Sequence, residues 1–403
     1  MPKILCLTSH DLNGPEQGAL LRARNVFKLL ARLGEVRLVL AGYHVAWTSH
    51  PGPVCGGFEL LRAIRFEPTK RVSISDRLQH ELNPRFMNTD WVQARPEDQA
   101  WLANTIAQHD LVWVHGVNIA NGFGRWRWPN GVLDIDDIPS SFHRSQLARA
   151  GSLKERMKTR RQVFLWQRHE RTLWERFEAV CVCSEPDRKL LNRPEKTFVV
   201  PNGFAKPEKP VARRPMNPPR IGFIGNFAYA PNLEGAWWLV KEVWPLILKK
   251  HPQARLRLAG DRSERENWPA GQNIDALGWL PDVAAEMAGW SLAVAPILSG
   301  GGTRIKIAEA FGYRCPTVST SLGAYGYAVK DGEELFLADN AADFAAKCNR
   351  ILAEPLTGEK LANRAWEKFE ASWTWDAQAG RVAAVVNKVL GASQARREEK
   401  LAA

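Results

Sequence analysis

The chain of 403 residues contains no long apolar run, and this limits where the protein can reside. A membrane-spanning helix needs about 18 consecutive, mostly apolar residues, and no stretch of the sequence approaches that length. The apolar segment ILCL near the amino terminus is also too short for the core of a secretory signal peptide. We therefore expect a protein that stays in the cytoplasm.

The sequence also lacks the cysteine spacing of a metal site or a disulfide framework. Its cysteines are scattered, mostly in apolar segments, without a CxxC pair or a neighbouring Cys/His cluster. We expect reduced thiols in the core and no bound metal. The cysteines are Cys6, Cys55, Cys181, Cys183, Cys315 and Cys348.

The length and the order of the predicted elements indicate two α/β domains. Strand-like and helix-like segments alternate along the chain, which is typical of doubly wound parallel sheets. We expect a first domain at 1–203, a proline-rich linker at 204–219, a second domain at 220–372 and a terminal helix and tail at 373–403. The predicted elements include a strand at 131–137, a long basic helix over about 145–177 and a helix over 232–250.

Residues 296–320, PILSGGGTRIKIAEAFGYRCPTVST, predict a glycine loop, a short buried helix and a strand. Glycines let a backbone approach a ligand closely, and the amino end of a helix carries partial positive charge. The helix is mostly apolar, yet it contains Arg304, Lys306 and Glu309. Charges on a buried helix need a partner, so this segment is a candidate phosphate site.

Short motifs follow one another in a fixed order between residues 196 and 375. They are VVPNG at 199–203, FIGNFAYAPN at 223–232, LGWLPD at 277–282, APILSGGGTRIKIAEAFGYRCPTVST at 295–320, LGAYG at 322–326 and EELFLADNAADFA at 333–345. Their order and spacing resemble the glycosyltransferase 4 family (glycosyl transferases group 1), which are retaining GT-B glycosyltransferases. The first half is similar more loosely, through Gly14, Arg22, Arg24, WVHG at 113–116, LDIDDIPS at 133–140 and VCSEPD at 182–187.

This resemblance implies a GT-B fold, in which two Rossmann-like domains face a cleft and the last helix crosses back to the first domain. It implies a hexosyltransferase-type enzyme that takes a sugar from a nucleotide-diphosphate sugar, bound mainly by the second domain. The acceptor, a glycan or a lipid-linked glycan of cell-surface polysaccharide or lipopolysaccharide synthesis, would lie mainly on the first domain. Neither a metal nor another cofactor is implied.

The departing nucleoside diphosphate must be stabilised by positive charge and backbone N–H groups when no metal does so. The family often supplies an Arg/Lys pair from the loop at 225–235, but this chain has neither residue there. Lys306 and Arg304 are the remaining cations, and the helical period places Lys306 on the same face as Glu309 but not Arg304. Glu309 matches a carboxylate that binds the ribose hydroxyls; the alternative is a surface pair with Lys306.

The first glutamate of the family's two-glutamate pattern falls at Gly301 in this chain. Backbone amides of Gly301, Gly302 and Thr303 are expected to bind the donor instead, while the alternative for Thr303 is a helix N-cap. Three further residues resemble donor-side positions. They are Asn226, Gly278 and Trp279, with core packing as the alternative for Trp279.

In the first domain His115 follows a predicted strand and matches a histidine near the donor sugar and the acceptor. A packed, structural histidine is the alternative. Asp134, Asp136 and Asp137 do not form a convincing metal cluster, because strand alternation separates Asp137 from the other two. Asp136 and Asp137 are expected to contact the acceptor or to cap a loop. Gly14 is a candidate for close approach to the diphosphate or the acceptor, or an ordinary turn residue.

The segment 144–171 carries nine Lys or Arg residues against Glu155 and Glu170, and the whole chain has a net charge of +12. Such a segment is either a solvated helix face or a contact with anionic lipid headgroups or an acidic glycan. Nucleic acid is not expected as a partner. Two alternatives to the transferase stay open: a GT-B nucleotide-sugar epimerase, and a non-catalytic scaffold that binds polyanions or membranes.

Overall fold

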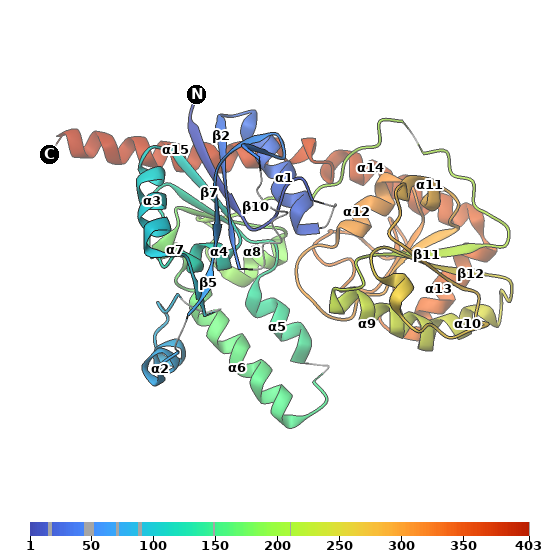
Figure 1. The fold of residues 1–403 in the computed structure, drawn as a ribbon. Coiled ribbons are helices and arrows are strands. Elements are labelled where there is room, and N and C mark those ends of the chain that lie inside the picture. Colours follow the sequence, from blue (N-terminus) through green and yellow to red (C-terminus); the bar gives the residue numbers. More distant parts are fainter. Residues whose placement is uncertain are drawn as a thin grey trace. The chain divides into compact units, whose positions relative to one another are not determined.

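The computed structural model describes residues 1–14, 18–43, 52–69, 72–87, 91–147, 150–209 and 211–402. The chain divides into two compact units, each described here by itself (Figure 1). The first unit contains Met1–Pro201 and Gln378–Ala403, and the second contains Asn202–Ala377. Each unit is built on one large, mainly parallel sheet with helices on both faces.

The first unit contains an eight-stranded sheet in the order β10-β9-β8-β7-β1-β2-β4-β3. All neighbouring strands are parallel except β3 and β4. The strands are β1 (Lys3–Thr8), β2 (Glu35–Gly42), β3 (Val54–Cys55), β4 (Phe58–Arg65), β7 (Leu111–His115), β8 (Gly131–Asp134), β9 (Ala179–Val182) and β10 (Thr197–Val199). A separate two-stranded sheet pairs β5 (Glu67–Pro68) with β6 (Val92–Gln93).

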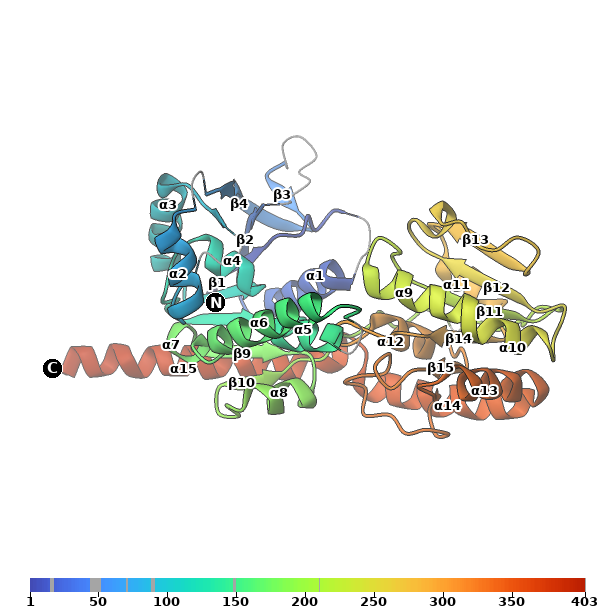
Figure 2. The same ribbon diagram turned by 90° about the horizontal axis from the view of Figure 1, so that it is seen from below.

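The helices of the first unit cover both faces of this sheet (Figure 2). Leu133 points into the core cluster beneath α3 and α4, so strand alternation turns Asp134 to the opposite face, where it meets α1. The terminal helix α15 (Ala379–Ala402) contacts α1, β7 and β10 and so belongs to this unit. The other helices are α1 (Gly18–Ala31), α2 (Ile74–Leu82), α3 (Pro96–Ala107), α4 (Val117–Gly122), α5 (Pro139–Leu147), α6 (Leu153–Glu170), α7 (Leu173–Arg176) and α8 (Glu185–Leu191).

The single basic helix expected over about 145–177 is wrong, because the chain forms α5, α6 and α7 there. Helix α6 begins at a capping box, in which the Ser152 side chain accepts from the Glu155 N–H and Glu155 reaches back to Ser152. The strand expected at 131–137 also ends early, at Asp134, so strand alternation does not decide where Asp137 points.

The second unit contains a six-stranded parallel sheet in the order β13-β12-β11-β14-β15-β16. Its strands are β11 (Arg220–Ile224), β12 (Arg255–Ala259), β13 (Ile274–Gly278), β14 (Leu292–Ala295), β15 (Thr317–Ser319) and β16 (Phe336–Leu337). Residues 211–219, in the expected linker, contain no helix or strand and lie against this unit, since the Arg214 N–H donates to the Ala288 carbonyl.

Alternate residues of β11 and β14 join core clusters on the two faces of this sheet. Helices α9 (Ala230–Trp238), α10 (Trp244–Leu248) and α13 (Ala341–Ala353) pack on one face, and α11 (Val283–Ala288), α12 (Ile305–Gly312) and α14 (Pro355–Ser372) on the other. The single helix expected over 232–250 is interrupted by a π-helical turn, Leu239–Val243, just before Pro245.

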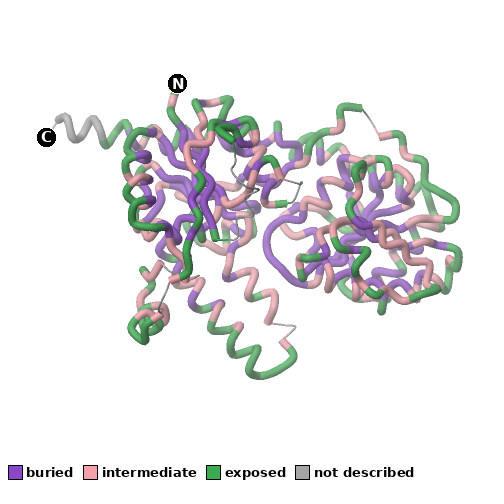
Figure 3. The backbone as a smooth tube through the Cα atoms, viewed as in Figure 1, coloured by how far each residue is buried: buried purple, intermediate pink, exposed green. Residues whose placement is uncertain are grey.

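Burial follows the two sheets, while α2 and much of α6 remain exposed (Figure 3). All six cysteines are free and buried, which confirms the expectation of core thiols. Among the described residues no helix is both long enough and apolar enough to cross a bilayer.

Candidate functional site

In the second unit the strand order reverses between β11 and β14. Successive strands run outward from β11 to β12 and β13 in one direction, and from β14 to β15 and β16 in the other. The loops after β11 and β14 therefore leave the sheet on opposite faces, and doubly wound sheets bind ligands at this point of reversal. The glycine loop at 300–302 and the amino end of α12 follow β14 there.

The glycine loop is shaped by backbone that a larger residue would not adopt easily. Gly300 has φ +104°, and a Cβ at this position would lie 2.7 Å from Nη2 of Arg304 and 3.1 Å from the Tyr229 hydroxyl. The Ser299 hydroxyl donates to Glu234 of α9 at 2.5 Å, which attaches the loop to the element after β11. The loop is thus held on both sides of the reversal point.

Arg304 is the N-cap residue of α12 and is buried. Its guanidinium donates to the carbonyl oxygens of Gly301 and Ser299, and its own carbonyl accepts from the Tyr327 hydroxyl at 2.9 Å. The alternative interpretation of Thr303 as the helix N-cap is therefore wrong, and the helix has no side-chain cap. The Thr303 hydroxyl is buried without a hydrogen-bond partner in the part of the chain that the structure describes.

Lys306 reaches from α12 to the element that follows β11. Its Nζ donates to Oδ1 of Asn232 at 2.7 Å and lies 4.4 Å from the ring centroid of Phe223. A Cβ at Gly225 would come within 3.1 Å of this Nζ. Burial, and then the charge of Arg304, lower the pKa of Lys306 to about 7, while Glu309 opposes the shift.

Glu309 lies one turn along α12 from Lys306 and is half-buried. The negative charge of Glu309 partly offsets the lowering of the Lys306 pKa. The two side chains are therefore electrostatically coupled, as their spacing of three residues predicts. The expected residues Gly301, Gly302, Thr303 and Arg304 thus lie before α12, and Lys306 and Glu309 lie in its first five residues.

The other expected donor residues occupy neighbouring loops. The Asn226 side chain accepts a hydrogen bond from the Ala228 N–H. The backbone carbonyl of Asn226 accepts from the side-chain amide of Asn232 at 2.8 Å, so Asn226 positions Asn232, which in turn binds Lys306. Gly278 ends β13, two strands away from β11. Trp279 is 65% exposed, which makes the core interpretation of this side chain wrong.

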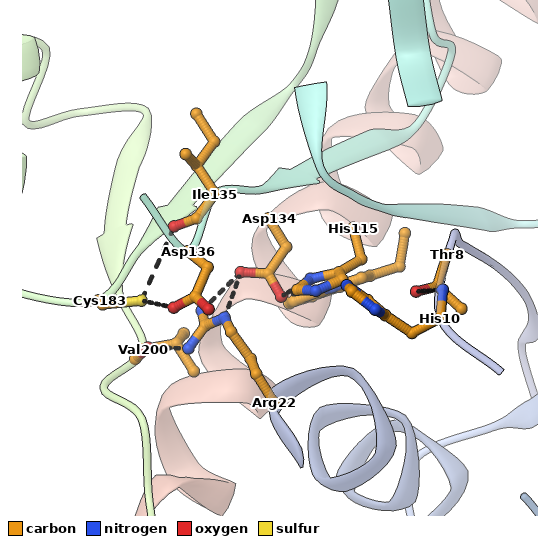
Figure 4. A network of polar contacts seen from close by, with 10 residues as sticks. Thr8, His10, Arg22, His115, Asp134, Ile135, Asp136, Cys183 and Val200 are labelled. Atoms are coloured by element: carbon orange, nitrogen blue, oxygen red, sulfur yellow. Dashed lines mark hydrogen bonds and ion pairs between the residues drawn. The ribbon is translucent and has the colours of Figure 1, made fainter. Parts of the chain in front are cut away.

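In the first unit the strand order reverses between β1 and β7, and a histidine follows or ends each of these strands. His115 ends β7 and His10 follows β1, with ring centroids 5.7 Å apart (Figure 4). Burial, and then electrostatic interaction with His115, lower the pKa of His10 to about 4, against the opposing effect of Asp136. His10 is therefore neutral at physiological pH.

A buried ionic network supports His115 (Figure 4). Arg22 donates from Nε and Nη2 to Asp134 Oδ1, and Asp134 Oδ2 lies 3.4 Å from Nδ1 of His115. Burial alone would raise the pKa of Asp134, but the Arg22 guanidinium, followed by His115, lowers it to about 2. Asp134 is thus a buried negative charge that is hydrogen-bonded to Arg22 and lies in ion-pair distance of His115.

Asp136, Asp137 and Gly14, the other residues predicted in the first unit, follow the ends of β8 and β1 in the chain. Asp136 Oδ1 accepts from the Cys183 thiol at 3.1 Å. Asp137 follows β8 and lines a cavity described below. Gly14 forms a turn, in which its N–H donates to the Asp11 carbonyl at 2.9 Å and its carbonyl accepts from Arg24 at 3.1 Å.

Three residues with clear roles in this geometry were not predicted as site residues. Asn232 positions Lys306, Asp134 positions His115, and His10 completes the histidine pair. His10 carried a usable signal, because it follows the first strand at the reversal point as His115 follows a later one. Among the described residues no group of three or more His, Cys, Asp and Glu side chains could hold a metal ion.

Comparison with solved structures defines the fold class. The chain superposes on the Anabaena protein HepE in complex with UDP-glucose with a TM-score of 0.62 and 14% identity, over 96% of this chain and 100% of that one. It superposes on WaaG, a glycosyltransferase involved in lipopolysaccharide biosynthesis, with a TM-score of 0.61 and 14% identity, over 95% and 99%. The chain has the GT-B fold, as the sequence predicted.

In the second unit, residues 218–354 match the family model of the Glycosyl transferases group 1. This confirms the predicted resemblance over these residues, while the narrower assignment to the glycosyltransferase 4 family stays a prediction. A relative from Klebsiella pneumoniae, an uncharacterized 44.6 kDa protein in the cps region, is 27% identical over 133 residues. That alignment spans 30% of this chain and 34% of the relative, about a third of its length.

Proposed function

We propose that this protein is a retaining glycosyltransferase that moves a sugar from a nucleotide-diphosphate sugar to a glycan or lipid-linked acceptor. The setting we propose is cell-surface polysaccharide or lipopolysaccharide synthesis, in the cytoplasm and at the inner face of the membrane. The observation that carries the proposal is the position of Lys306 at the amino end of α12, where the strand order of the second unit reverses. The HepE complex with UDP-glucose and the lipopolysaccharide role of WaaG support the donor and acceptor classes.

In this reaction the bond between the anomeric carbon and the diphosphate oxygen breaks, and negative charge grows on the departing diphosphate. We propose that Lys306 and the N–H groups at the amino end of α12 stabilise that charge without a metal. Asn232 and Phe223 hold the ammonium in place before the donor binds, so little reorganisation is needed. Glu309 would accept hydrogen bonds from the ribose hydroxyls.

His115 is the candidate for contact with the transferred sugar or the acceptor hydroxyl. Asp134 orients its ring from one side, and Arg22 keeps Asp134 ionised. The contact between Asp134 and His115 is an ion pair rather than a hydrogen bond, because Nδ1 of His115 has no hydrogen-bond partner among the described residues. Retention of anomeric configuration rests on the sequence resemblance.

The proposal is tested by incubating the protein with UDP-, GDP- and ADP-sugars and measuring both nucleotide release and nucleotide binding. We expect saturable binding of at least one nucleotide and slow release from its sugar. Lys306→Ala and Glu309→Ala should each weaken binding by roughly tenfold or more, because charge-assisted contacts to the nucleotide are lost. Lys249→Ala, at an exposed position of the same unit, should bind normally.

Two outcomes would favour the alternatives over a transferase. An epimerised donor without nucleotide release would indicate an epimerase. Absence of any saturable nucleotide binding would overturn the enzyme assignment and favour a scaffold.

We further propose that α6 and α2 contact an anionic membrane. Leu153, Met157 and Phe164 are 74%, 63% and 59% exposed and lie within about 40° of one another around α6. Basic residues flank them on the same helix: Lys154, Arg156, Lys158, Arg160, Arg161 and Arg168. Arg149, which belongs to the basic segment predicted from the sequence, lies outside the described residues.

Helix α2 adds a second exposed apolar stripe with Ile74, Leu78 and Leu82 at helical spacing. It is attached to α6, because Arg161 and Arg168 of α6 both donate to Glu81. Apolar side chains beside cations are the composition of helices that lie in the headgroup region.

A further inference from the structure

A cavity of about 510 Å³ lies inside the first unit, between α2, α4, α5 and α6. Its volume falls in the range of small-molecule sites. Three aromatic side chains, Trp91, Phe142 and Trp166, line it. All three are half-buried, and Trp91 and Trp166 pack against His80 and His169 with ring centroids 5.5 and 5.9 Å apart.

His169 gives this cavity a buried polar group that lacks a partner. The side chain is 7% exposed, and Nε2 has no hydrogen-bond partner among the described residues. A backbone hydrogen bond with Pro84 involves the other ring nitrogen, and because proline has no N–H the ring must be the donor. Burial, followed by the charges of His80, Arg168 and Arg176, lowers the pKa of His169 to about 4. Nε2 is therefore a lone-pair acceptor without a partner among the described residues, on a side chain that lines the cavity.

The remaining described polar lining includes two amides, one paired guanidinium and one carboxylate. Gln162 and Asn118 contribute side-chain amides, which both donate and accept. The one guanidinium in the lining, Arg161, is paired with Glu81, and Asp137 would repel an anion. Phosphate and other anions are therefore poorly matched to this cavity.

Aromatic faces combined with neutral donors and acceptors fit a pyranose ring. The C–H face of such a ring packs on an aromatic side chain, while its hydroxyls point outward and need both donors and acceptors. Two lining residues follow members of the His115 network closely in the chain. Asn118 is three residues after His115, and Asp137 is three residues after Asp134.

We propose that this cavity binds a neutral pyranose of the acceptor, with His169 Nε2 accepting a hydroxyl hydrogen and Gln162 completing the contacts. That the sugar belongs to the acceptor rests on the function proposed above. The binding of a sugar at this place stands on the cavity alone. The acceptor class is thus an uncharged sugar residue at the growing end of a glycan.

The test uses the full-length protein and methyl glycosides of glucose, galactose, mannose, rhamnose and N-acetylglucosamine at millimolar concentrations. Binding is followed by saturation-transfer-difference NMR and by tryptophan fluorescence, which Trp91 and Trp166 should report. Gln162→Leu and His169→Phe keep the approximate shape but remove the hydrogen-bonding groups. Gln167→Leu is the matched control, because Gln167 is half-buried on the same helix and does not line the cavity. Thermal melting checks that each variant folds.

We expect at least one glycoside to bind saturably, and both cavity variants to weaken it roughly tenfold while Gln167→Leu leaves it unchanged. The proposal is overturned if no glycoside binds to the wild-type protein, or if the cavity variants bind like the control. Nucleotide binding, measured in the same samples, separates the two proposals. A protein that binds nucleotide but no glycoside contradicts the sugar cavity only. A protein that binds glycoside but no nucleotide contradicts the transferase proposal, and it still supports the proposal that the cavity binds a sugar.

Discussion

Arg22 and Asp134 form an ion pair in which neither side chain is exposed to solvent. Nη2 of Arg22 lies 2.5 Å from Oδ1 of Asp134, and Nη1 donates to the Val200 carbonyl at 2.8 Å. Two charges can be buried together only if their geometry offsets the cost of desolvation. The pair connects α1, β8 and the residue after β10, next to His115. A change that breaks the pair should therefore affect both the stability of the first unit and the position of His115.

Removing one partner should reveal how strongly the unit depends on the pair. Arg22→Met leaves Asp134 as an uncompensated buried charge, and we expect a loss of about 3–5 kcal/mol in the free energy of unfolding. Urea unfolding followed by circular dichroism measures it. Lys28→Met, at an exposed position on the same helix, should cost less than about 0.5 kcal/mol. A loss below about 1 kcal/mol in Arg22→Met would show that Asp134 finds another partner.

Lys306 is expected to reduce stability in return for nucleotide binding. Its folded pKa of about 7 lies below the value of 10.5 for an ordinary lysine, so the folded protein disfavours the charged form. Lys306→Met should therefore raise the free energy of unfolding by about 1 kcal/mol while it weakens nucleotide binding.

The pH dependence of this gain has a definite sign. Between pH 7 and 10.5 the unfolded chain holds more protons than the folded one, so the wild-type protein gains stability as pH rises through this window. The advantage of Lys306→Met should be largest at pH 7 and below and should shrink toward pH 10.5. A variant that is less stable than wild type at pH 7 would contradict this account.

The same pKa predicts proton uptake on binding of a nucleoside diphosphate. Binding favours the charged ammonium, so the affinity should fall as pH rises from 7 to 9, and up to one proton should be taken up per site. Calorimetric titration in buffers of different ionisation enthalpy measures the uptake. In Lys306→Met both the uptake and the pH dependence should disappear. If the variant retains them, another group is responsible.

The parallel sheets were predictable because their strands are continuous apolar runs between loops, as in β1, β7 and β14. The break before α6 also had a signal, since Ser152 and Glu155 form a recognisable capping box. Helix α14 also had a sequence signal, because the apolar residues Leu361, Ala365 and Phe369 recur every four residues and are buried. No helix was predicted there.

The pairs that build the sites could not be predicted in the same way. Asn232 and Lys306 lie 74 residues apart, and Arg22 and Asp134 lie 112 apart. Each pair meets only because particular strands are neighbours in a sheet, and the sequence does not state strand order. Local periodicity correctly placed Lys306 and Glu309 on one helix face, but it could not show that Arg304 turns back onto the glycine loop.

The exposed faces of α6 and α2 lead to a prediction about membranes. The full-length protein should sediment with vesicles that contain about 30% phosphatidylglycerol and should bind weakly to pure phosphatidylcholine, because both cations and apolar side chains contribute. Met157→Gln together with Phe164→Gln should reduce binding at all salt concentrations. By contrast, Lys154→Gln with Lys158→Gln should reduce it mainly at low salt, where electrostatic attraction is least screened. Leu356→Gln, at an exposed apolar position in the second unit, serves as the control. Equal binding by wild type and the Met157/Phe164 variant would show that the apolar face stays in water and that the basic helix is only a solvated surface.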